Sequence, residues 1–426
     1  MKAIKKNYHW IILAILFSEM IIYGGMGNAI GVFTIPIVED LGIGRGAYSL
    51  TSSVKALVGT VSTYVAFHVF RKFGYKRSVI FSLAICMVSC ILRGISHSFG
   101  MLMFSQALYG VAIGSLDTQG AVKAVDRWFH AHKGLILGFV TMATGLGGSV
   151  MSIVLTEITE SYSWRMASFA SAGFFALLIV LYLFMKDKPE QMGLEPYGER
   201  QKPKQKEKRH ASHENWHGRS VKELYRKPTF YLMTICVFMV VFCAKLSFTT
   251  IIPHFQDLGY SPTDAAMFNS VLMLSLAFAK LGCGELCDLI GAKKVTVICV
   301  VCLAAGQLLM AVSQGMVIAY TSMVLLAIGF VMWTIMIPLL TRPLFGYAPS
   351  DALIGTFFAA VSLSGFLPEP IINFVYDAVG SYVPVYYGAA VMDVVLLAAF
   401  LVLFRMCEKD KQKYLQEEES GKNEIY

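Results

Sequence analysis

The sequence predicts an all-helical membrane protein with about twelve transmembrane helices. Of its 426 residues, 56% are hydrophobic and only 15% are charged, whereas an ordinary soluble domain is about 45–50% apolar and about 25% charged. Apolar runs of the length that spans a bilayer, about 20 residues, recur along the whole chain. The basic residues form short blocks between these runs. The surplus of apolar surface must therefore face lipid.

The apolar runs give the position of each span. Backbone groups inside a bilayer must be satisfied within their own segment, so we expect these runs to be helices rather than strands. The expected spans cover residues 10–37, 47–70, 78–97, 100–122, 134–157, 164–185, 229–253, 265–287, 294–313, 316–340, 351–376 and 382–406. The first of them is too long for the apolar region of a cleaved signal peptide.

A polar segment at residues 186–227 divides the spans into two sets of six. It holds twelve Lys or Arg residues and is too polar to pack a core, so we expect a partly disordered loop. The predicted organisation is an N-terminal six-helix bundle at 1–185, this basic cytoplasmic loop, a C-terminal six-helix bundle at 228–406, and a cytoplasmic tail at 407–426.

The distribution of positive charge predicts the orientation. If the N-terminus is inside, seventeen Lys or Arg residues flank the spans on the cytoplasmic side, and the opposite side carries only Arg45, Arg93 and Arg165. Lys and Arg are enriched in cytoplasmic loops. We therefore expect a multi-pass protein of the cell (inner) membrane with both termini cytoplasmic. The net charge of +8 is explained by these flanks, without a nucleic-acid partner.

Neither a metal site nor an enzyme active site is predicted. The nine cysteines lie in or near apolar runs, and the CxxC pair Cys299 and Cys302 has no second pair or His cluster beside it. The chain contains no GxSxG or paired-Asp protease motif, and its one HExxH string, at residues 213–217, lies in the polar segment between the two sets of spans rather than in an expected helix. We expect no cofactor and no catalytic residue.

Two short basic loops, each after the second span of a half, look like copies of one motif. They are 217 positions apart, about half the chain. A glycine in each permits a tight turn, and an Asp at a helix end can pair with loop cations. The conformational motif residues are Arg71 and Gly74 in the first copy and Gly284, Asp288 and Gly291 in the second.

These loops resemble the signature G-x-x-x-D-R-x-G-R-R of the major facilitator superfamily. The second copy departs from it at Leu289, and the first has Phe67 for Gly and Arg71 for Asp. The resemblance implies a major facilitator fold, with two six-helix halves and a substrate site near the midplane between them. It also implies a transporter, which we expect to be a monomer.

A narrower resemblance lies at the start of the fifth span. Arg127-Trp128-Phe129 and the glycines that follow are similar to the corresponding segment of monocarboxylate transporters and bacterial oxalate/formate antiporters. The resemblance implies that the substrate is a small organic anion. Close helix packing is an equally good reason for small residues at Gly134, Gly138, Gly145 and Gly148.

Three lysines lie inside the predicted spans, where an ammonium group costs about 2.5–3.5 kcal/mol. Lys280 stands four residues before Gly284, at the spacing where the resembled families carry a substrate-anchoring Arg; the alternative is an ion pair with Glu285 or Asp288. Lys245 is a candidate second anion contact, or else pairs with an acid across the bundle. Lys55 lines the outer cavity or snorkels to the headgroups.

Two aromatic and three acidic side chains complete the candidate site. Tyr23 shares a helix face with Glu19, and Trp333 is a candidate aromatic wall or a packing residue. Glu19 is a candidate protonatable coupling group or a fixed partner for a lysine. The candidate coupling or gating residues are Glu19, Asp117 in the fourth span and Glu369, which lies between two prolines at an expected kink.

Two departures from the resembled families leave the substrate and coupling open. Leu276 stands where proton-coupled monocarboxylate transporters have an acid, and residues 353–368 contain no Lys or Arg where the oxalate/formate antiporters have a Lys. We expect a secondary transporter of a mono- or dicarboxylate that works by anion antiport or proton symport. The alternatives are a facilitator for a neutral or cationic solute, such as a sugar or drug, and a non-transporting membrane receptor.

Overall fold

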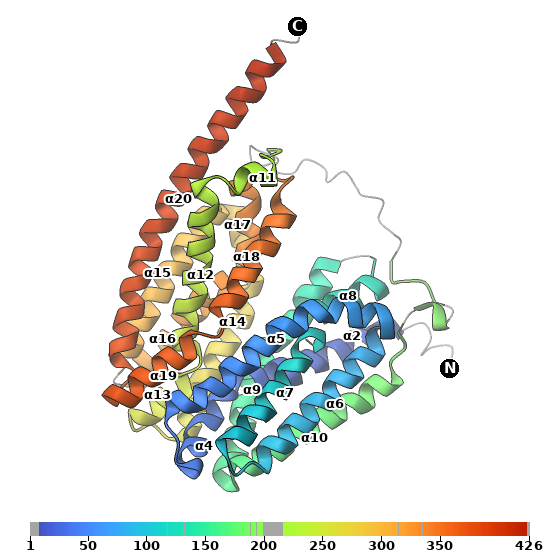
Figure 1. Ribbon diagram of the computed structural model, residues 1–426, viewed down its shortest axis with the longest axis vertical. Coiled ribbons are helices and arrows are strands. Elements are labelled where there is room, and N and C mark those ends of the chain that lie inside the picture. Colours follow the sequence, from blue (N-terminus) through green and yellow to red (C-terminus); the bar gives the residue numbers. More distant parts are fainter. Residues whose placement is uncertain are drawn as a thin grey trace. The chain divides into compact units, whose positions relative to one another are not determined.

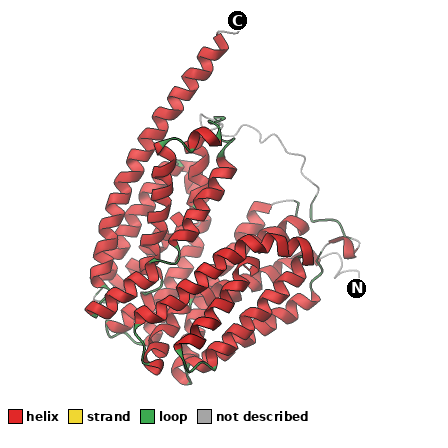
Figure 2. Cartoon of the chain, viewed as in Figure 1, coloured by secondary structure: helices red, strands yellow, loops and turns green. Residues whose placement is uncertain are grey.

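The computed structural model is built from helices (Figures 1 and 2). It describes residues 8–116, 118–130, 133–187, 189–192, 194–198, 216–313, 315–333 and 335–423. Within these ranges there is no strand, and only one isolated bridge joins Phe129 to Tyr197. The helices are α2 (Tyr8–Glu19), α3 (Gly25–Asn28), α4 (Thr34–Leu41), α5 (Arg45–Phe73), α6 (Tyr75–Gly94), α7 (Phe99–Leu116), α8 (Thr118–Trp128), α9 (Lys133–Ser161), α10 (Trp164–Phe184), α11 (Val221–Leu224), α12 (Pro228–Phe248), α13 (Ile251–Asp257), α14 (Pro262–Ile290), α15 (Ala292–Ala311), α16 (Met316–Phe330), α17 (Met336–Phe345), α18 (Ser350–Ser364), α19 (Pro368–Val379) and α20 (Val383–Asn423).

The helices have the length and composition that membrane spans need. In the part of the chain that the structure describes, eleven helices are long and apolar enough to cross a bilayer. The remaining predicted span is α5, which has 29 residues but carries Lys55 and many Ser and Thr residues, so its composition is more polar. The helical fold class predicted from the apolar runs is confirmed.

The helices form two compact units. Unit 1 contains residues Met1–Gln205 together with Thr249–Phe278 and Glu369–Tyr382. Unit 2 contains Lys206–Phe248, Ala279–Pro368 and Val383–Tyr426. Unit 1 therefore combines the N-terminal helices α2–α10 with α13, the first part of α14 and most of α19.

Small residues let helices approach closely in unit 1. A side chain at Gly145 would lie 2.8 Å from the carbonyl oxygen of Met273 in α14, and one at Gly147 would overlap the Ile21 carbonyl. Gly148 is equally close to Asn28. The packing role predicted for Gly145 and Gly148 is confirmed. It is wrong for Gly138, where no described atom lies within 4 Å, because that part of α9 has no close helix beside it.

We expect Gly147→Ala to lower the free energy of unfolding by about 1–3 kcal/mol, because the added methyl overlaps backbone that cannot move aside easily. Thermal unfolding of the purified protein in detergent measures this. Gly138→Ala in the same helix is the matched control, since it gains the same helix propensity without the overlap. Equal stability of the two variants would contradict the packing argument.

Hydrogen bonds also tie the first part of α14 into unit 1. The Asn269 amide donates to the Ser152 hydroxyl at 2.7 Å, and the Ser270 hydroxyl donates to the Ser149 carbonyl at 2.7 Å. Both contacts link α14 to α9. In unit 2, the Gln307 amide of α15 donates to the Cys243 carbonyl of α12 at 3.0 Å. Each unit thus satisfies polar side chains between its helices, as a membrane interior requires.

Candidate functional site

Several spans are broken partway along. The first continues from α2 through a π-helical turn at Met20–Gly24 and a 3-10 turn at Ile30–Phe33 before α4 begins. The span of α16 passes through a 3-10 turn at Val331–Trp333 before α17. A further break separates α18 from α19. Irregular backbone at membrane depth is tolerated where it is buried in protein or lines a cavity, so these breaks mark candidate site regions.

Lys55 and Tyr23, both predicted substrate contacts, approach the same aromatic ring in unit 1. The Lys55 ammonium lies 5.9 Å from the ring centroid of Tyr109 in α7. The rings of Tyr23 and Tyr109 are stacked with centroids 6.2 Å apart. The sequence analysis missed Tyr109, because a Tyr in an apolar run carries no signal of its own. A lysine near an aromatic face gains cation–π attraction where water is excluded.

Glu19 is fully buried in the interior of unit 1. It accepts a short hydrogen bond from the Tyr182 hydroxyl of α10, which is itself 3.3 Å from the Tyr75 hydroxyl of α6. The second carboxyl oxygen of Glu19 has no hydrogen-bond partner among the described residues. The partner that the sequence analysis missed is thus a tyrosine rather than a lysine.

Glu19 and Tyr23, which are predicted to share a helix face, contact two neighbouring helices. Glu19 contacts α10 and Tyr23 contacts α7. These two helices meet through the rings of Tyr109 and Phe175, whose centroids are 6.1 Å apart, so the shared face stays a prediction. A π-helical turn starts directly after Glu19.

In unit 2 the structure brings Lys245 and Trp333 together, as the site prediction requires. The Lys245 ammonium lies 5.4 Å from the Trp333 ring centroid and donates to the Gly365 carbonyl at 3.2 Å. Phe248 packs on the same indole at 5.6 Å. The indole N–H is buried and unbonded within the described ranges. The arrangement is a half-buried cation beside an aromatic wall, at the breaks that precede α17 and α19.

Lys280 lies half-buried in the middle of α14, and Leu276, one turn before it, is only 4% exposed. Glu369 is half-buried in the first turn of α19, so the expected break at its flanking prolines is confirmed. Asp117 lies outside the described residues. The functional roles of Lys280, Glu369 and Asp117 stay predictions.

The two loop motifs form tight turns, as predicted. Gly74 between α5 and α6 and Gly291 between α14 and α15 both have positive φ, +82° and +88°. Arg71 and Asp288 are exposed and Gly284 is partly exposed. Among the described residues, Asp288 makes no ion pair; Lys293 of its loop pairs with Glu408 of α20 at 2.6 Å. The expectation that Asp288 pairs with loop cations is therefore wrong for the described residues, and Lys293 pairs with an acid of α20 instead.

An acid from a distant part of the sequence contacts the first loop motif, which contains no acid of its own. Asp187, just after α10, accepts a hydrogen bond from the Lys76 backbone N–H at 3.1 Å and pairs with Arg127 at 3.0 Å. It thereby satisfies an N–H group at the start of α6 and ties α8 to the same point. Asp187 lies 110 or more residues from Arg71 and Gly74, so the local motif does not reveal it.

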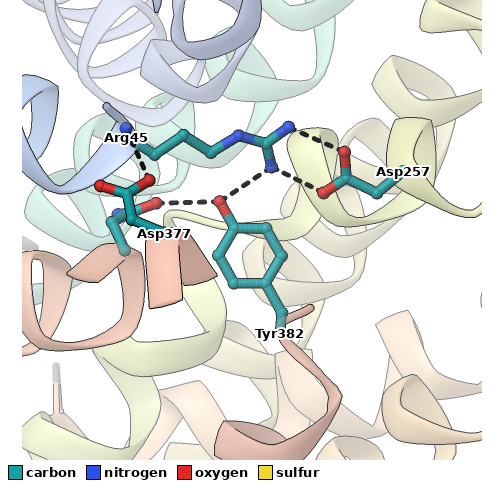
Figure 3. A network of polar contacts seen from close by, with 5 residues as sticks. Arg45, Asp257, Asp377 and Tyr382 are labelled. Atoms are coloured by element: carbon teal, nitrogen blue, oxygen red, sulfur yellow. Dashed lines mark hydrogen bonds and ion pairs between the residues drawn. The ribbon is translucent and has the colours of Figure 1, made fainter. Parts of the chain in front are cut away.

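A polar network joins the start of α5 to the ends of α13 and α19 in unit 1 (Figure 3). Arg45 binds Asp257 through two hydrogen bonds of 2.6 and 2.7 Å and donates to the Tyr382 hydroxyl at 3.1 Å. Tyr382 in turn donates to Asn373 at 2.8 Å. Asp377 accepts from the backbone N–H groups of Arg45 and its neighbour at 3.0 and 2.8 Å. We call this network the Arg45 clasp.

The three arginines on the cation-poor side all have structural partners. Arg45 belongs to the clasp, Arg165 pairs with Asp40 at 2.8 Å, and Arg93 donates to Ser168 at 2.9 Å. The Arg165 guanidinium lowers the pKa of the Asp40 carboxyl through a charged hydrogen bond. The sequence analysis used these arginines only for orientation. Because arginines are rare on that side, their presence there could have indicated that they have structural partners.

Comparison with known proteins identifies relatives along the whole chain. Monocarboxylate transporter 12 of Xenopus laevis is 20% identical over 99% of this chain and 94% of its own length. The protein named probable nitrate transporter NarT of Staphylococcus epidermidis is 22% identical, covering 88% and 90%. The oxalate:formate antiporter of Oxalobacter formigenes is 23% identical, covering 83% and 81%.

The fold has solved counterparts. A crystal structure of a mutant of the nucleoside transporter NupG matches with a TM-score of 0.75 at 14% identity, covering 93% of this chain and all of that one. At this identity the likeness concerns the fold alone. The model of the family described as Major Facilitator Superfamily matches residues 15–368. Broken spans, paired loop turns and full-length relatives agree with that match, and this multi-pass membrane chain belongs to the Major Facilitator Superfamily.

Proposed function

We propose that the protein is a secondary active transporter of a small organic anion, a mono- or dicarboxylate. The observation that carries the proposal is the half-buried Lys245 ammonium held beside the Trp333 indole where two spans are broken. A cation is costly inside a membrane and marks a pathway for an anion. An aromatic wall beside it suits the apolar part of an organic acid.

The relatives support an anion rather than a neutral solute. Three full-length relatives are named for the transport of monocarboxylates, of oxalate and formate, and of nitrate, which are all anions. The nucleoside transporter shares the fold at 14% identity, which carries no substrate with it. Lys55 with Tyr23 in unit 1 and Lys245 with Trp333 in unit 2 offer cationic and aromatic groups from both halves of the sequence.

In the proposed mechanism the anion binds near the bilayer midplane, with Lys280 as the anchor of the carboxylate. Lys245 and Lys55 add positive charge, and Tyr23 and Trp333 contact the rest of the substrate. The two halves then rock about the bound anion in alternating access. The loop turns at Gly74 and Gly291 form the latch at the cytoplasmic side, with both termini on that side in the cell membrane and the protein acting as a monomer.

The direct test is transport by purified protein in liposomes. We expect labelled lactate, formate or oxalate to be taken up or exchanged, and uridine not to be. Uptake of uridine without any of the three carboxylates would overturn the proposal in favour of a neutral solute. Binding of a carboxylate with neither uptake nor exchange would instead indicate a receptor.

Coupling is proposed to be anion antiport or proton symport, with Glu19, Asp117 and Glu369 as the candidate coupling or gating residues. Glu19 is the best placed of the three to carry a proton, since it is fully buried and its hydrogen bond comes from a neutral tyrosine.

In a symporter, Glu19→Gln is expected to abolish uptake driven by a pH gradient and to retain exchange of internal for external anion. Glu160→Gln, at the end of α9, is a control that should keep both activities. Gradient-driven uptake that survives Glu19→Gln would remove Glu19 from the coupling step.

A further inference from the structure

A small cavity with polar and apolar walls lies inside unit 1, among the first span and α5, α6, α7 and α10. Its polar lining consists of Lys55, Arg93, Gln106, Tyr109 and Ser171, and its apolar wall includes Met26 and Phe33. Two of these side chains are cationic, and the lining contains no Asp or Glu. The cavity therefore favours an anionic or strongly hydrogen-bonding group. Its small size admits one end of a ligand rather than a bulky solute.

Arg93 is the most unusual of these residues. It is 7% exposed, near the end of α6, and its guanidinium carbon lies over the Phe33 ring, 4.0 Å from the ring centroid. Its Nε donates to the Ser168 hydroxyl at 2.9 Å. Its two terminal amino groups donate no hydrogen bond to any residue that the structure describes. A buried arginine normally satisfies its fork of donors with a carboxylate or carbonyl.

Gln106 and Tyr109 give an independent observation that points to a ligand. Gln106 is 5% exposed and its amide makes no hydrogen bond within the described ranges. The Tyr109 hydroxyl is buried and has no oxygen or nitrogen partner among the described residues, and the Cys86 thiol beside it offers at most a weak hydrogen bond. Buried polar groups without partners are rare and costly. Two of them in the lining of one cavity, beside a half-satisfied arginine, indicate a site that a ligand completes.

We propose that Arg93, Gln106 and Tyr109 form a carboxylate-binding subsite within the N-terminal half of the transporter. The two terminal amino groups of Arg93 match the two oxygens of a carboxylate, which have lone pairs left for the Gln106 amide and the Tyr109 hydroxyl. Lys55 adds positive charge, and the Met26 and Phe33 wall takes an aliphatic part of the acid. The subsite rests on the proposed transport of organic anions and adds binding residues to it.

The competing explanation is that Arg93 serves only as a structural charge for Glu369. Both residues act electrostatically on Tyr48 of α5, so they lie in the same neighbourhood. A purely structural role predicts that Arg93→Gln lowers stability, that Glu369→Gln restores it, and that ligand affinity of the folded protein is unchanged. The subsite predicts a loss of affinity that Glu369→Gln does not restore.

The test is lactate binding by the full-length protein in nanodiscs, measured by calorimetry. We expect Arg93→Gln to weaken binding by about 30-fold or more, as loss of one member of a buried charge pair does. Arg93→Lys should bind at an intermediate level, because it keeps the charge and loses the fork. The matched control is Arg165→Gln, which removes an arginine that pairs with Asp40 and does not line the cavity.

Gln106→Leu gives a second readout that a packing role does not produce. It replaces a buried, unpaired amide by an apolar side chain of similar size, so thermal stability should stay level or rise while lactate affinity falls. Unchanged affinity in both Arg93→Gln and Gln106→Leu, with a wild-type protein that binds lactate, would overturn the subsite and leave the transport proposal standing. If the wild type neither binds nor transports lactate, formate or oxalate, both proposals fail.

Discussion

Replacing Asp257 by asparagine is expected to lower the free energy of unfolding by about 2 kcal/mol and to loosen the Arg45 clasp. Removing one partner of a buried ion pair costs about 3–5 kcal/mol, because the other charge stays buried. The cost is smaller here because the Asp257 side chain is 25% exposed and Arg45 is 10% exposed. Arg45 retains Tyr382 as a partner and can still donate to the asparagine amide oxygen, but it loses the negative charge and one of its two hydrogen bonds to this residue.

The clasp is expected to matter for transport as well as for stability. It connects the start of α5, from the N-terminal half of the sequence, with α13 and α19 from the C-terminal half. Alternating access requires such contacts to break and form again on one side of the membrane. A weakened clasp should therefore increase the time that this end of unit 1 spends open.

Cysteine labelling measures the opening. Ser49 is fully buried in α5, one turn after Arg45, so Ser49→Cys provides a reporter. We expect a membrane-impermeant thiol reagent to label it faster when Asp257→Asn is added. Asp264→Asn is the control, because Asp264 bonds only to nearby Ser261. Arg45→Lys should fall between wild type and Asp257→Asn, and equal labelling in all variants would show that the clasp does not control opening.

Lys280→Ala is expected to reduce carboxylate uptake by about 30-fold or more. If the Lys280 ammonium binds the substrate carboxylate, its removal leaves the anion without its counter-charge in a site with little water, which costs about 2–5 kcal/mol. Lys280→Arg keeps the positive charge and should retain part of the uptake, although its planar fork differs in shape from an ammonium.

Initial rates of uptake into liposomes, at matched protein content, measure the effect. Lys293→Ala is the matched lysine control, since Lys293 follows the same helix and pairs with Glu408 on an exposed surface. Exposed ion pairs contribute about 0–1 kcal/mol, so this variant should transport normally. Normal uptake by Lys280→Ala would exclude Lys280 as the anchor, and Lys245 would become the first candidate in its place.

The spans could be predicted because their signal is local. Each helix satisfies its own backbone in lipid, so an apolar run is enough to place it. The positive-φ turns at Gly74 and Gly291 are local for the same reason. The breaks at Met20–Gly24 and Val331–Trp333 have no comparable signal, because π and 3-10 turns depend on what packs against them.

The charged residues of the candidate site could be proposed from the sequence, and most of their partners could not. Lys245 could be proposed because a lysine in an apolar run is energetically costly. The structure places it beside Trp333, another candidate, while the role of both in binding stays a prediction. Tyr109 and Gln106 were not expected, because neither residue is unusual in a membrane helix. Arg93 was counted only among the positive charges on the side opposite the cytoplasm, although it lies inside the expected span 78–97; the structure places it in the last turn of α6 and buries it.

The sequence by itself determined the membrane class, the helical spans and the glycine turns. These depend on how favourably each segment's side chains enter lipid and on hydrogen bonds within its own backbone. Only the tertiary structure decided which polar groups meet. Arg45 and Asp257 are 212 positions apart, and Glu19 and Tyr182 are 163 apart. A buried polar side chain has to find its partner on another helix, and which helix lies beside it is a property of the packed unit and not of the local sequence.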